Sequence, residues 1–322
     1  MHSIRIHATG GPEVLSFEES VLPAPGPGQA LVRHEAIGIN FIDVYHRVGL
    51  YPVGRPFTPG LEAAGVVEQV GEDVEVVRPG DRVAYADVLG AYAESAVVPA
   101  DRLVPVPAGV SSEDAAAVML QGMTAQYLAT ATRPLAPGDS CLVHAAAGGL
   151  GLLLCQVAHG RGARVIATVS TEAKAALARE AGADEVILYT QQDFEAETRR
   201  LTGGAGVQVV YDSVGKTTFE GGLRVLAPLG TMVLCGQSSG PVPPFDPQLL
   251  AQRGSLHLTR PRLFDYIRGR EALLARASEV LCWVADGTLK VRIGERWPLA
   301  RAGDAHRALE ARTTTGKLLL TP

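Results

Sequence analysis

The sequence lacks the features that mark several classes of protein. Its 322 residues contain only four cysteines, at positions 141, 155, 235 and 282, and no two of them form a Cys-x-x-Cys pair. Such pairs are typical of zinc and redox sites, so neither site is predicted, and the scattered cysteines fit a reducing compartment. The N-terminus also lacks the apolar stretch of a secretory signal. We therefore expect a cytoplasmic protein.

Positive charge is scarce as well. Lys and Arg total 29 against 34 Asp and Glu, which gives a formal net charge of -5. This balance provides no overall attraction for nucleic acid or for an anionic membrane. Residues 141–158 carry no charge and approach the length of a membrane span. The Gly-Gly-Leu-Gly interruption within them favours a strand followed by a helix instead.

The chain does contain abundant apolar residues, 47% of the total, so a sizeable core is expected. The first third is rich in valine and in turn signals. Short strands are predicted at 31–39, 62–70 and 81–87, and they indicate a mainly β half. From Glu113 the sequence changes to that of an alanine-rich helix, for which Ser111 or Ser112 can serve as the N-cap.

Strands then alternate with helical stretches, which is typical of βαβ units and a parallel sheet. We predict an α/β fold: a doubly wound Rossmann domain over residues 123–264, and a mainly β domain over residues 1–122. The segment 265–322 begins with a long helix and then resembles the first third, so it is expected to return to the β domain.

A glycine-rich turn follows the first predicted strand of the Rossmann domain. It reads Ala-Ala-Ala-Gly-Gly-Leu-Gly over residues 145–151, and Ala146 stands where the dinucleotide fingerprint usually has its first glycine. Small residues let backbone N–H groups approach a pyrophosphate, and the last glycine lets the helix pack on the strand. A packing turn is the alternative, but the strand-turn-helix context favours nucleotide binding by Gly148, Gly149, Leu150 and Gly151.

The next strand bears on the choice of nucleotide. A site for NAD usually ends this strand with Asp or Glu, whereas here it ends in Val169-Ser170-Thr171, and Lys174 follows. Hydroxyls and an ammonium suit a 2′-phosphate, so Ser170 and Lys174 favour NADPH. The neighbouring Glu172 and a merely solvated lysine argue for the alternative, NAD.

Other candidates follow the later strands, because a parallel sheet binds ligands beyond the carboxyl ends of its strands. They are Tyr189, Ser213 and the run Gly236, Gln237, Ser238 and Ser239. The last run, with Gly240, also matches the Gly-x-Ser-x-Gly signature of hydrolases. That signature needs a helix directly after the serine, and the proline-rich segment here disfavours one.

Several motifs occur in the order of a known family: residues 10–15 (GGPEVL), 38–43 (GINFID), 59–65 (PGLEAAG), 79–83 (PGDRV), 145–151, 211–215 (YDSVG) and 315–317 (TGK). The chain resembles medium-chain dehydrogenases/reductases of the NADPH:quinone oxidoreductase branch, the zeta-crystallin relatives, over nearly its whole length. The resemblance implies a GroES-like domain beside the Rossmann domain and NADPH-dependent reduction of a quinone.

Zinc alcohol dehydrogenases of this superfamily need a cysteine near Asn40 and Gly-His-Glu where this chain has Gly60-Leu61-Glu62. Neither ligand is present, and no cysteine precedes position 141. A catalytic zinc normally has three protein ligands, so no metal site is expected and hydride transfer runs without one. Such chemistry suits a quinone, which accepts hydride readily; a conjugated enone meets the same condition, so an enone reductase is the alternative.

The resemblance also implies site residues. Asn40, Phe41, Asp43 and Tyr45 would border the nicotinamide and the quinone, and Tyr127 would border the cofactor. Tyr45 could donate a hydrogen bond to a quinone oxygen, and Asn40 could hold either the cofactor or the substrate. The alternative is that these residues only support a loop. It places NADPH on the Rossmann residues already named and on Arg312. The chain departs from its relatives at Gln237, where they often carry Asn, and at Gln121, where some carry Lys.

Two further functions need weighing. Some relatives bind RNA, and residues 252–276 hold six arginines: Arg253, Arg260, Arg262, Arg268, Arg270 and Arg276. Few aromatic residues lie between them, so binding of nucleic acid is not expected. A crystallin-like protein with little turnover would differ from an enzyme only in rate. Because the strand near residues 254–257 ends the predicted sheet and would leave an open edge, a homodimer is expected.

Overall fold

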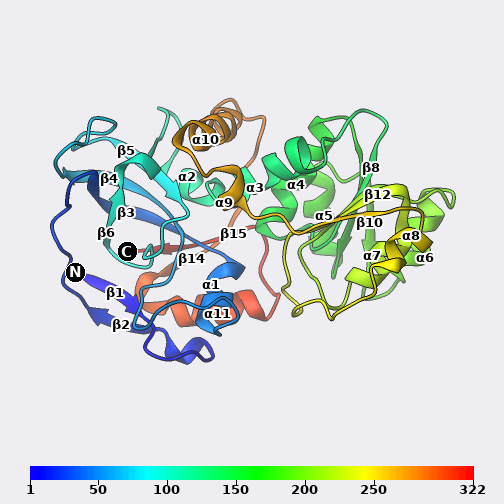
Figure 1. Cartoon of the computed structure of the whole chain (residues 1–322), viewed down its shortest axis with the longest axis horizontal. Coiled ribbons are helices and arrows are strands. Elements are labelled where there is room, and N and C mark those ends of the chain that lie inside the picture. Colours follow the sequence, from blue (N-terminus) through cyan, green and yellow to red (C-terminus); the bar gives the residue numbers. More distant parts are fainter. The chain divides into compact units, whose positions relative to one another are not determined.

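The computed structural model describes all 322 residues, which divide into two compact units. Unit 1 combines the two ends of the chain, Met1–Met123 and Ile267–Pro322, and unit 2 is the continuous stretch Thr124–Tyr266. Figure 1 traces both units in sequence colours. The prediction of a mainly β domain and a doubly wound α/β domain is confirmed by the two sheets described next.

Unit 1 is built on a seven-stranded sheet in which β14, β15, β3, β4, β5 and β7 lie in that order and β6 pairs with β3. The last strand of the chain, β15, runs antiparallel to β3 and so joins the C-terminal segment to the first third. The strand bounds are β3 (Gln29–Ile39), β4 (Glu62–Val70), β5 (Arg82–Ala86), β6 (Ser95–Pro99), β7 (Val104–Pro105), β14 (Ile293–Pro298) and β15 (Lys317–Thr321).

A two-stranded sheet and several helices complete unit 1. The most important for the site is α1 (Phe41–Arg47), which follows β3 directly. The remaining elements are β1 (His2–Arg5), β2 (Ser16–Glu19), α2 (Ser112–Val118), α10 (Arg270–Ala285), α11 (Ala302–Glu310) and the short 3₁₀ turns at Pro12–Val14, Ala100–Arg102 and Leu299–Arg301.

The single alanine-rich helix expected from Glu113 is broken in the structure. Ser111 caps α2 by accepting from the amide of Asp114, but α3 (Gln121–Tyr127) starts anew and a π-helical turn follows at Leu128–Thr132. At the break, the amide of Leu120 donates to the Glu62 carboxylate at 2.7 Å. A tertiary hydrogen bond has therefore overridden the local preference for a continuous helix.

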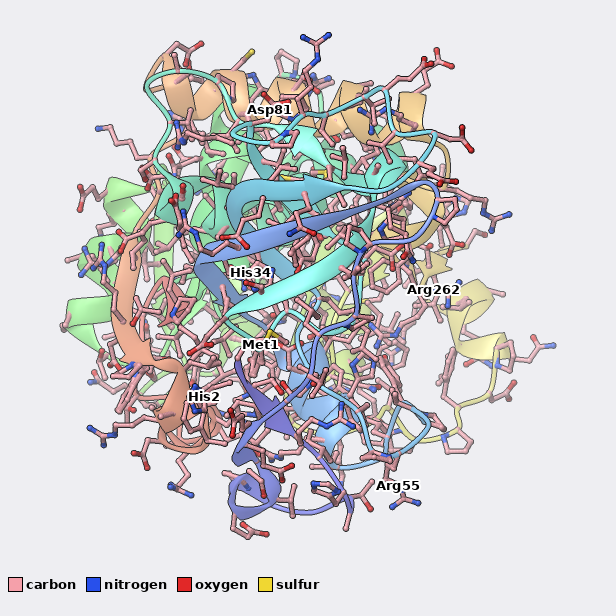
Figure 2. All side chains as sticks on the ribbon, turned by 90° about the vertical axis from the view of Figure 1, so that its left-hand side faces the viewer. Met1, His2, His34, Arg55, Asp81 and Arg262 are labelled. Carbon is pink, nitrogen blue, oxygen red and sulfur yellow. The ribbon has the colours of Figure 1, made fainter.

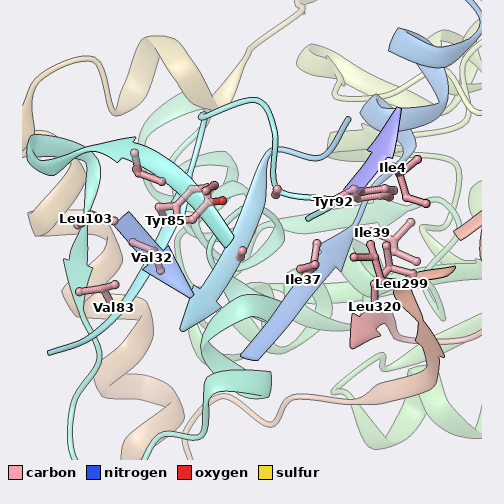
Figure 3. Close-up of a cluster of buried hydrophobic side chains, with 14 of the residues drawn as sticks. Ile4, Val32, Ile37, Ile39, Val83, Tyr85, Tyr92, Leu103, Leu299 and Leu320 are labelled. Atoms are coloured by element: carbon pink, nitrogen blue, oxygen red, sulfur yellow. The ribbon is translucent and has the colours of Figure 1, made fainter. Parts of the chain in front are cut away.

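The core of unit 1 draws on both ends of the chain. Figure 3 shows Ile4, Tyr92 and Ile39 lying close to Leu299 and Leu320, although these residues come from the two segments of the unit. His34 lies among the strands (Figure 2), where its ring bonds the Ala93 carbonyl at 2.8 Å and the Tyr85 hydroxyl at 2.9 Å. Its polar atoms are thus satisfied inside the core.

Unit 2 is a six-stranded, wholly parallel sheet in the order β10, β9, β8, β11, β12, β13. The order reverses between β8 and β11, which is the switch point where doubly wound sheets bind their ligands. The strands are β8 (Ser140–Val143), β9 (Arg164–Val169), β10 (Glu185–Leu188), β11 (Val207–Asp212), β12 (Leu226–Leu234) and β13 (His257–Thr259).

Helices connect these strands as the sequence pattern predicts. They are α4 (Gly149–Gly160), α5 (Glu172–Glu180), α6 (Phe194–Leu201), α7 (Phe219–Val225) and α8 (Gln248–Gln252), and α9 (Leu263–Tyr266) follows the last strand. The uncharged stretch 141–158 forms the end of β8 and most of α4. None of the helices combines the length and the apolarity that a membrane crossing requires.

Candidate active site

The turn between β8 and α4 is shaped for an anion. Ala145 adopts a left-handed conformation, with φ 53°, and Gly148 occupies the N-cap of α4 without any side-chain cap. A Cβ on Gly151 would lie 2.4 Å from the Ala145 carbonyl oxygen, so only glycine lets the helix approach this closely. The first amides of a twelve-residue helix are therefore left for a ligand, as pyrophosphate binding requires.

The residues predicted to select the nucleotide lie beyond two neighbouring strands, β9 and β10. The amide of Tyr189 donates to the Val169 carbonyl at 3.1 Å, which places Tyr189 beside the end of β9 and close to Ser170. Thr171 caps α5 by accepting from the amide of Lys174. Partial burial lowers the pKa of the Lys174 ammonium. Contact of this ammonium with a 2′-phosphate stays a prediction.

Ser213 and the run Gly236–Ser239 come together at the ends of β11 and β12. The amide of Ser238 donates to the Ser213 carbonyl at 3.2 Å, and the loop is held from below by Asp212, whose carboxylate accepts from the amides of Val214 and Gly215. No helix begins until Gln248, so Ser238 does not sit on a nucleophile elbow and the hydrolase alternative is wrong.

Tyr127 is engaged inside unit 2. It is only 1% exposed, and its ring stacks on that of Tyr266 with centroids 4.0 Å apart. Arg312, in unit 1, follows α11 in a left-handed conformation with φ 58°. For both residues, contact with the cofactor stays a prediction.

In unit 1, Asn40 lies at the centre of a buried polar cluster that also contains Glu62, Gln121 and Lys317. Its Oδ1 accepts from Lys317 Nζ at 2.9 Å and from Gln121 Nε2 at 3.0 Å. Its Nδ2 donates to Glu62 Oε2 at 2.6 Å and to the Gly38 carbonyl at 3.4 Å. All four hydrogen-bonding positions of the Asn40 amide are thus used within the protein.

Glu62 and Lys317 belong to two of the sequence motifs, but their buried ion pair was not predicted. They form an ion pair of 2.5 Å, with side chains 0% and 2% exposed. Charged residues are almost never fully buried unless paired, and each of these two side chains is the partner of the other. Nowhere in the chain do three or more His, Cys, Asp or Glu side chains form a group that could hold a metal ion.

Asp43 is completely buried and fixes the start of α1. Its Oδ2 accepts from the Asn40 amide at 2.8 Å and from the Tyr92 hydroxyl at 3.0 Å, which completes a capping box with Asn40. Burial raises the pKa of the Asp43 carboxyl to about 7. Asp43 has no exposed surface and fixes the start of α1 through Asn40, and its contact with a cofactor stays a prediction.

A chain of buried hydrogen bonds leads from Asp43 to the C-terminal helix α11. Arg47 only donates, so its bond of 3.0 Å makes His306 Nδ1 an acceptor, and the imidazole is neutral with its proton on Nε2. Nε2 then donates to the Tyr92 oxygen at 3.0 Å. Burial and the nearby Arg47 lower the pKa of His306 to about 3. The bidentate pair of Arg47 with Glu310, at 2.8 and 2.9 Å, closes the chain.

Aromatic rings gather on and after α1. The ring of Tyr45 packs edge to face on that of Tyr51, with ring centroids 5.3 Å apart, and its centroid lies 6.2 Å from that of Phe41. The ring centroids of Tyr51 and His46 are 6.3 Å apart. The sequence prediction included Phe41 and Tyr45 but missed Tyr51, whose amide donates to the Tyr45 carbonyl at 3.1 Å. Phe41, Tyr45, His46 and Tyr51 thus form one aromatic group, in which the side chain of Tyr45 is largely buried.

Several arginines of residues 252–276 bond within the protein. Arg270 donates to the carbonyls of Ala100, Asp101 and Leu103, and Arg262 pairs with Asp265 at 3.0 Å. Arg260 donates to the Leu234 carbonyl. Since half of the six arginines have these partners, the expectation against nucleic-acid binding stands as a prediction.

Two family models match the sequence. Residues 26–108 match the model described as alcohol dehydrogenase GroES-like domain, and residues 149–280 match the model described as zinc-binding dehydrogenase. The first lies within unit 1. The second covers most of unit 2 and the start of α10.

Full-length relatives are also found. A quinone oxidoreductase of Pseudomonas aeruginosa is 47% identical over 321 residues, covering 99% of both chains. A 2-haloacrylate reductase of Burkholderia sp. is 42% identical over 325 residues, covering 98% of both. Among solved structures, the quinone oxidoreductase of Escherichia coli in complex with NADPH superposes with a TM-score of 0.98, at 44% identity and with complete coverage of both chains.

Proposed function

The chain belongs to the quinone oxidoreductase family of the medium-chain dehydrogenases/reductases, and we propose from this premise that it is an NADPH-dependent quinone reductase that needs no zinc. The observation that carries the proposal is similarity of 45–47% identity to quinone oxidoreductases along the entire chain. Two features support a dinucleotide as the reductant: the N-terminus of α4 has no side-chain cap, and Gly151 lets this helix pack closely against the turn at Ala145.

Bound NADPH would supply a hydride from C4 of its nicotinamide ring. The protein's part is to bind, orient and exclude water. Gly148, Gly149, Leu150 and Gly151 are proposed to hold the pyrophosphate, with Ser170, Lys174 and Tyr189 around the adenosine and its 2′-phosphate. Ser213 and Gly236–Ser239, which share one loop system, are proposed to line the rest of the cofactor site, together with Tyr127 and Arg312.

On the acceptor side, Tyr45 and Phe41 belong to an aromatic group whose faces suit stacking on a quinone ring. A tyrosine hydroxyl there is a donor for the quinone oxygen on which negative charge develops as hydride arrives. Asn40 and Asp43 are proposed to support this surface by fixing the start of α1.

Reduction of an activated alkene is the second candidate. The 42% identical relative named 2-haloacrylate reductase favours it, because a conjugated enone or acrylate accepts hydride at carbon by the same geometry. The two candidates differ in substrate and share every residue assigned above.

Oxidation of NADPH measured with a simple quinone, an enone, 2-haloacrylate and, in reverse, an alcohol with NADP⁺ tests the proposal. We expect the quinone to give the highest kcat/KM, NADPH to exceed NADH, and a chelator to have no effect. Faster turnover of the enone or haloacrylate would favour the second candidate. Alcohol oxidation abolished by the chelator would contradict both.

A cytoplasmic homodimer completes the proposal. Strand β13 forms one edge of the unit 2 sheet, and its Leu258 and Thr259 are partly exposed. Pairing with the same edge of a second copy would satisfy its backbone groups. Light scattering after size exclusion should give twice the monomer mass, and Leu258→Pro should reduce the measured mass to that of the monomer.

Localisation in the cytoplasm is proposed as well. The four unpaired cysteines are compatible with a reducing cytoplasm.

A further inference from the structure

The orientation of the Asn40 amide follows from the charges beside it. The Lys317 ammonium has only donors, and the Glu62 carboxylate paired with it has only acceptors. Lys317 Nζ lies 2.9 Å from one of the two terminal atoms of the Asn40 amide, so this terminal atom must be the acceptor oxygen, Oδ1. Glu62 Oε2 lies 2.6 Å from the other terminal atom of the Asn40 amide, which must be the donor nitrogen, Nδ2.

The same reasoning fixes Gln121. Because Asn40 Oδ1 is an acceptor, the Gln121 atom 3.0 Å away must be the donor Nε2, and the remaining amide atom is the carbonyl Oε1. This oxygen is buried and has no hydrogen-bond partner in the protein, although the side chain as a whole is only half-buried. Leaving a buried acceptor without a donor costs free energy, so the site is incomplete without one.

We propose that Gln121 Oε1 is a direct ligand contact, which accepts a hydrogen bond from an N–H or O–H group on one of the two reacting rings. This inference rests on the proposed function. A quinone carries only acceptor oxygens, so Gln121 Oε1 does not hold the oxidised substrate through them. The reacting rings carry two kinds of donor: the primary amide of the nicotinamide and the hydroxyl of the hydroquinone product.

The proposal separates two roles within the cluster. Asn40 has no hydrogen-bonding position left for a ligand, so it is a positioning residue that acts through Gln121. Lys317 and Glu62 prevent the Asn40 amide from turning over, and this in turn keeps the Gln121 oxygen facing the ligand. The contact predicted for Asn40 therefore passes to a residue for which the sequence suggested no role.

Two substitutions of Gln121 isolate its oxygen. Gln121→Lys keeps an N–H donor for Asn40 Oδ1 and removes the acceptor. Gln121→Met, of similar length, removes both. If only the bond to Asn40 matters, Gln121→Lys behaves as the wild type; if the acceptor matters, both variants show the same defect.

Binding measured by calorimetry provides the test, in two arms. The first compares NADP⁺ with its 3-acetylpyridine analogue, in which a methyl ketone without N–H replaces the amide. The second, with NADP⁺ bound, compares hydroquinone with its dimethyl ether, which has no O–H. In the arm that contains the true donor, the wild type should prefer the donor-bearing ligand by about 5- to 30-fold, and both variants should lose this preference.

The outcomes are separable. Loss of preference in the first arm assigns the nicotinamide amide, and loss in the second assigns the hydroquinone hydroxyl. Preferences that persist in both variants in both arms, or that are lost only in Gln121→Met, would overturn the inference. If the wild type fails to bind NADP⁺ at all, the proposed function itself is wrong.

Discussion

Lys317 and Glu62 form an ion pair of 2.5 Å inside unit 1, although 255 residues separate them in the sequence. The pair connects the last strand, β15, to the start of β4. It also faces Asn40, so one contact holds both the sheet and the candidate site.

Replacing Lys317 by Met should destabilise the protein by about 3–5 kcal/mol, because the Glu62 carboxylate would then remain buried without its counter-charge. Chemical denaturation of unit 1 would measure the loss. Arg262→Ala is the control, since its pair with Asp265 is exposed and worth at most ~1 kcal/mol. Adding Glu62→Leu to Lys317→Met should restore part of the stability, whereas an additive loss would contradict the explanation.

Gly151→Ala should abolish tight binding of NADPH. The new Cβ would lie 2.4 Å from the Ala145 carbonyl oxygen and 2.6 Å from Ala146 Cα, so the anion-binding turn must shift. We expect the dissociation constant to rise at least about tenfold, or ~1.4 kcal/mol, in a fluorescence titration. Gly160→Ala, in the same helix, meets nothing within 4 Å and should leave binding unchanged. An equal effect of both substitutions would point to helix stability instead.

Lys174→Ala should narrow the preference for NADPH over NADH. A charge-assisted bond to the 2′-phosphate is worth about 1.5–3 kcal/mol, so the ratio of the two kcat/KM values should fall by about 10- to 100-fold through loss of NADPH affinity. Arg179→Ala removes the same charge from the other end of α5 and serves as the control. An unchanged ratio in Lys174→Ala would reject its role.

The buried carboxyl of Asp43 should make stability depend on pH. Its pKa is about 7 in the folded protein against 3.8 for an exposed group, so between these values the folded state keeps a proton that the unfolded state has lost. Stability from this group therefore falls as the pH rises from about 4 to 7. Relative to Asp43→Asn, the wild type should lose on the order of 4 kcal/mol over this interval.

Unfolding by denaturant at several pH values would measure this difference. His34 and His306, whose pKa values are lowered to about 4 and 3 by burial, act in the opposite direction. Both histidines are present in the wild type and in Asp43→Asn, so their contributions to the pH dependence cancel when the two proteins are compared. A difference that does not change with pH would mean that Asp43 is ionised throughout.

The sequence predicted unit 2 well because its signals are local. Alternation of apolar strands with helices specifies a parallel sheet, and the glycines at 148, 149 and 151 mark the turn after β8. The residues at the ends of β9, β11 and β12 could be named for the same reason. Their contacts with a cofactor stay predictions.

The polar cluster of unit 1 could not be predicted, because its members are distant in sequence. Nothing near Lys317 in the sequence indicates that its ammonium is buried against Glu62, and nothing near Gln121 indicates that its amide oxygen is buried without a donor. The helix break at Leu120 has the same origin, since its amide bonds to Glu62. Local helix propensity favoured a continuous helix at this position, but the tertiary hydrogen bond to Glu62 interrupts it.

The division of unit 1 between the two ends of the chain affects the order in which the two units can fold during synthesis. Unit 2 is continuous, so its sheet can form on the ribosome before synthesis ends. Unit 1 has to wait for β15, which carries Lys317, and for α11, which carries His306 and Glu310. A nascent polypeptide stopped short of these last residues would therefore have a complete unit 2 and an incomplete unit 1.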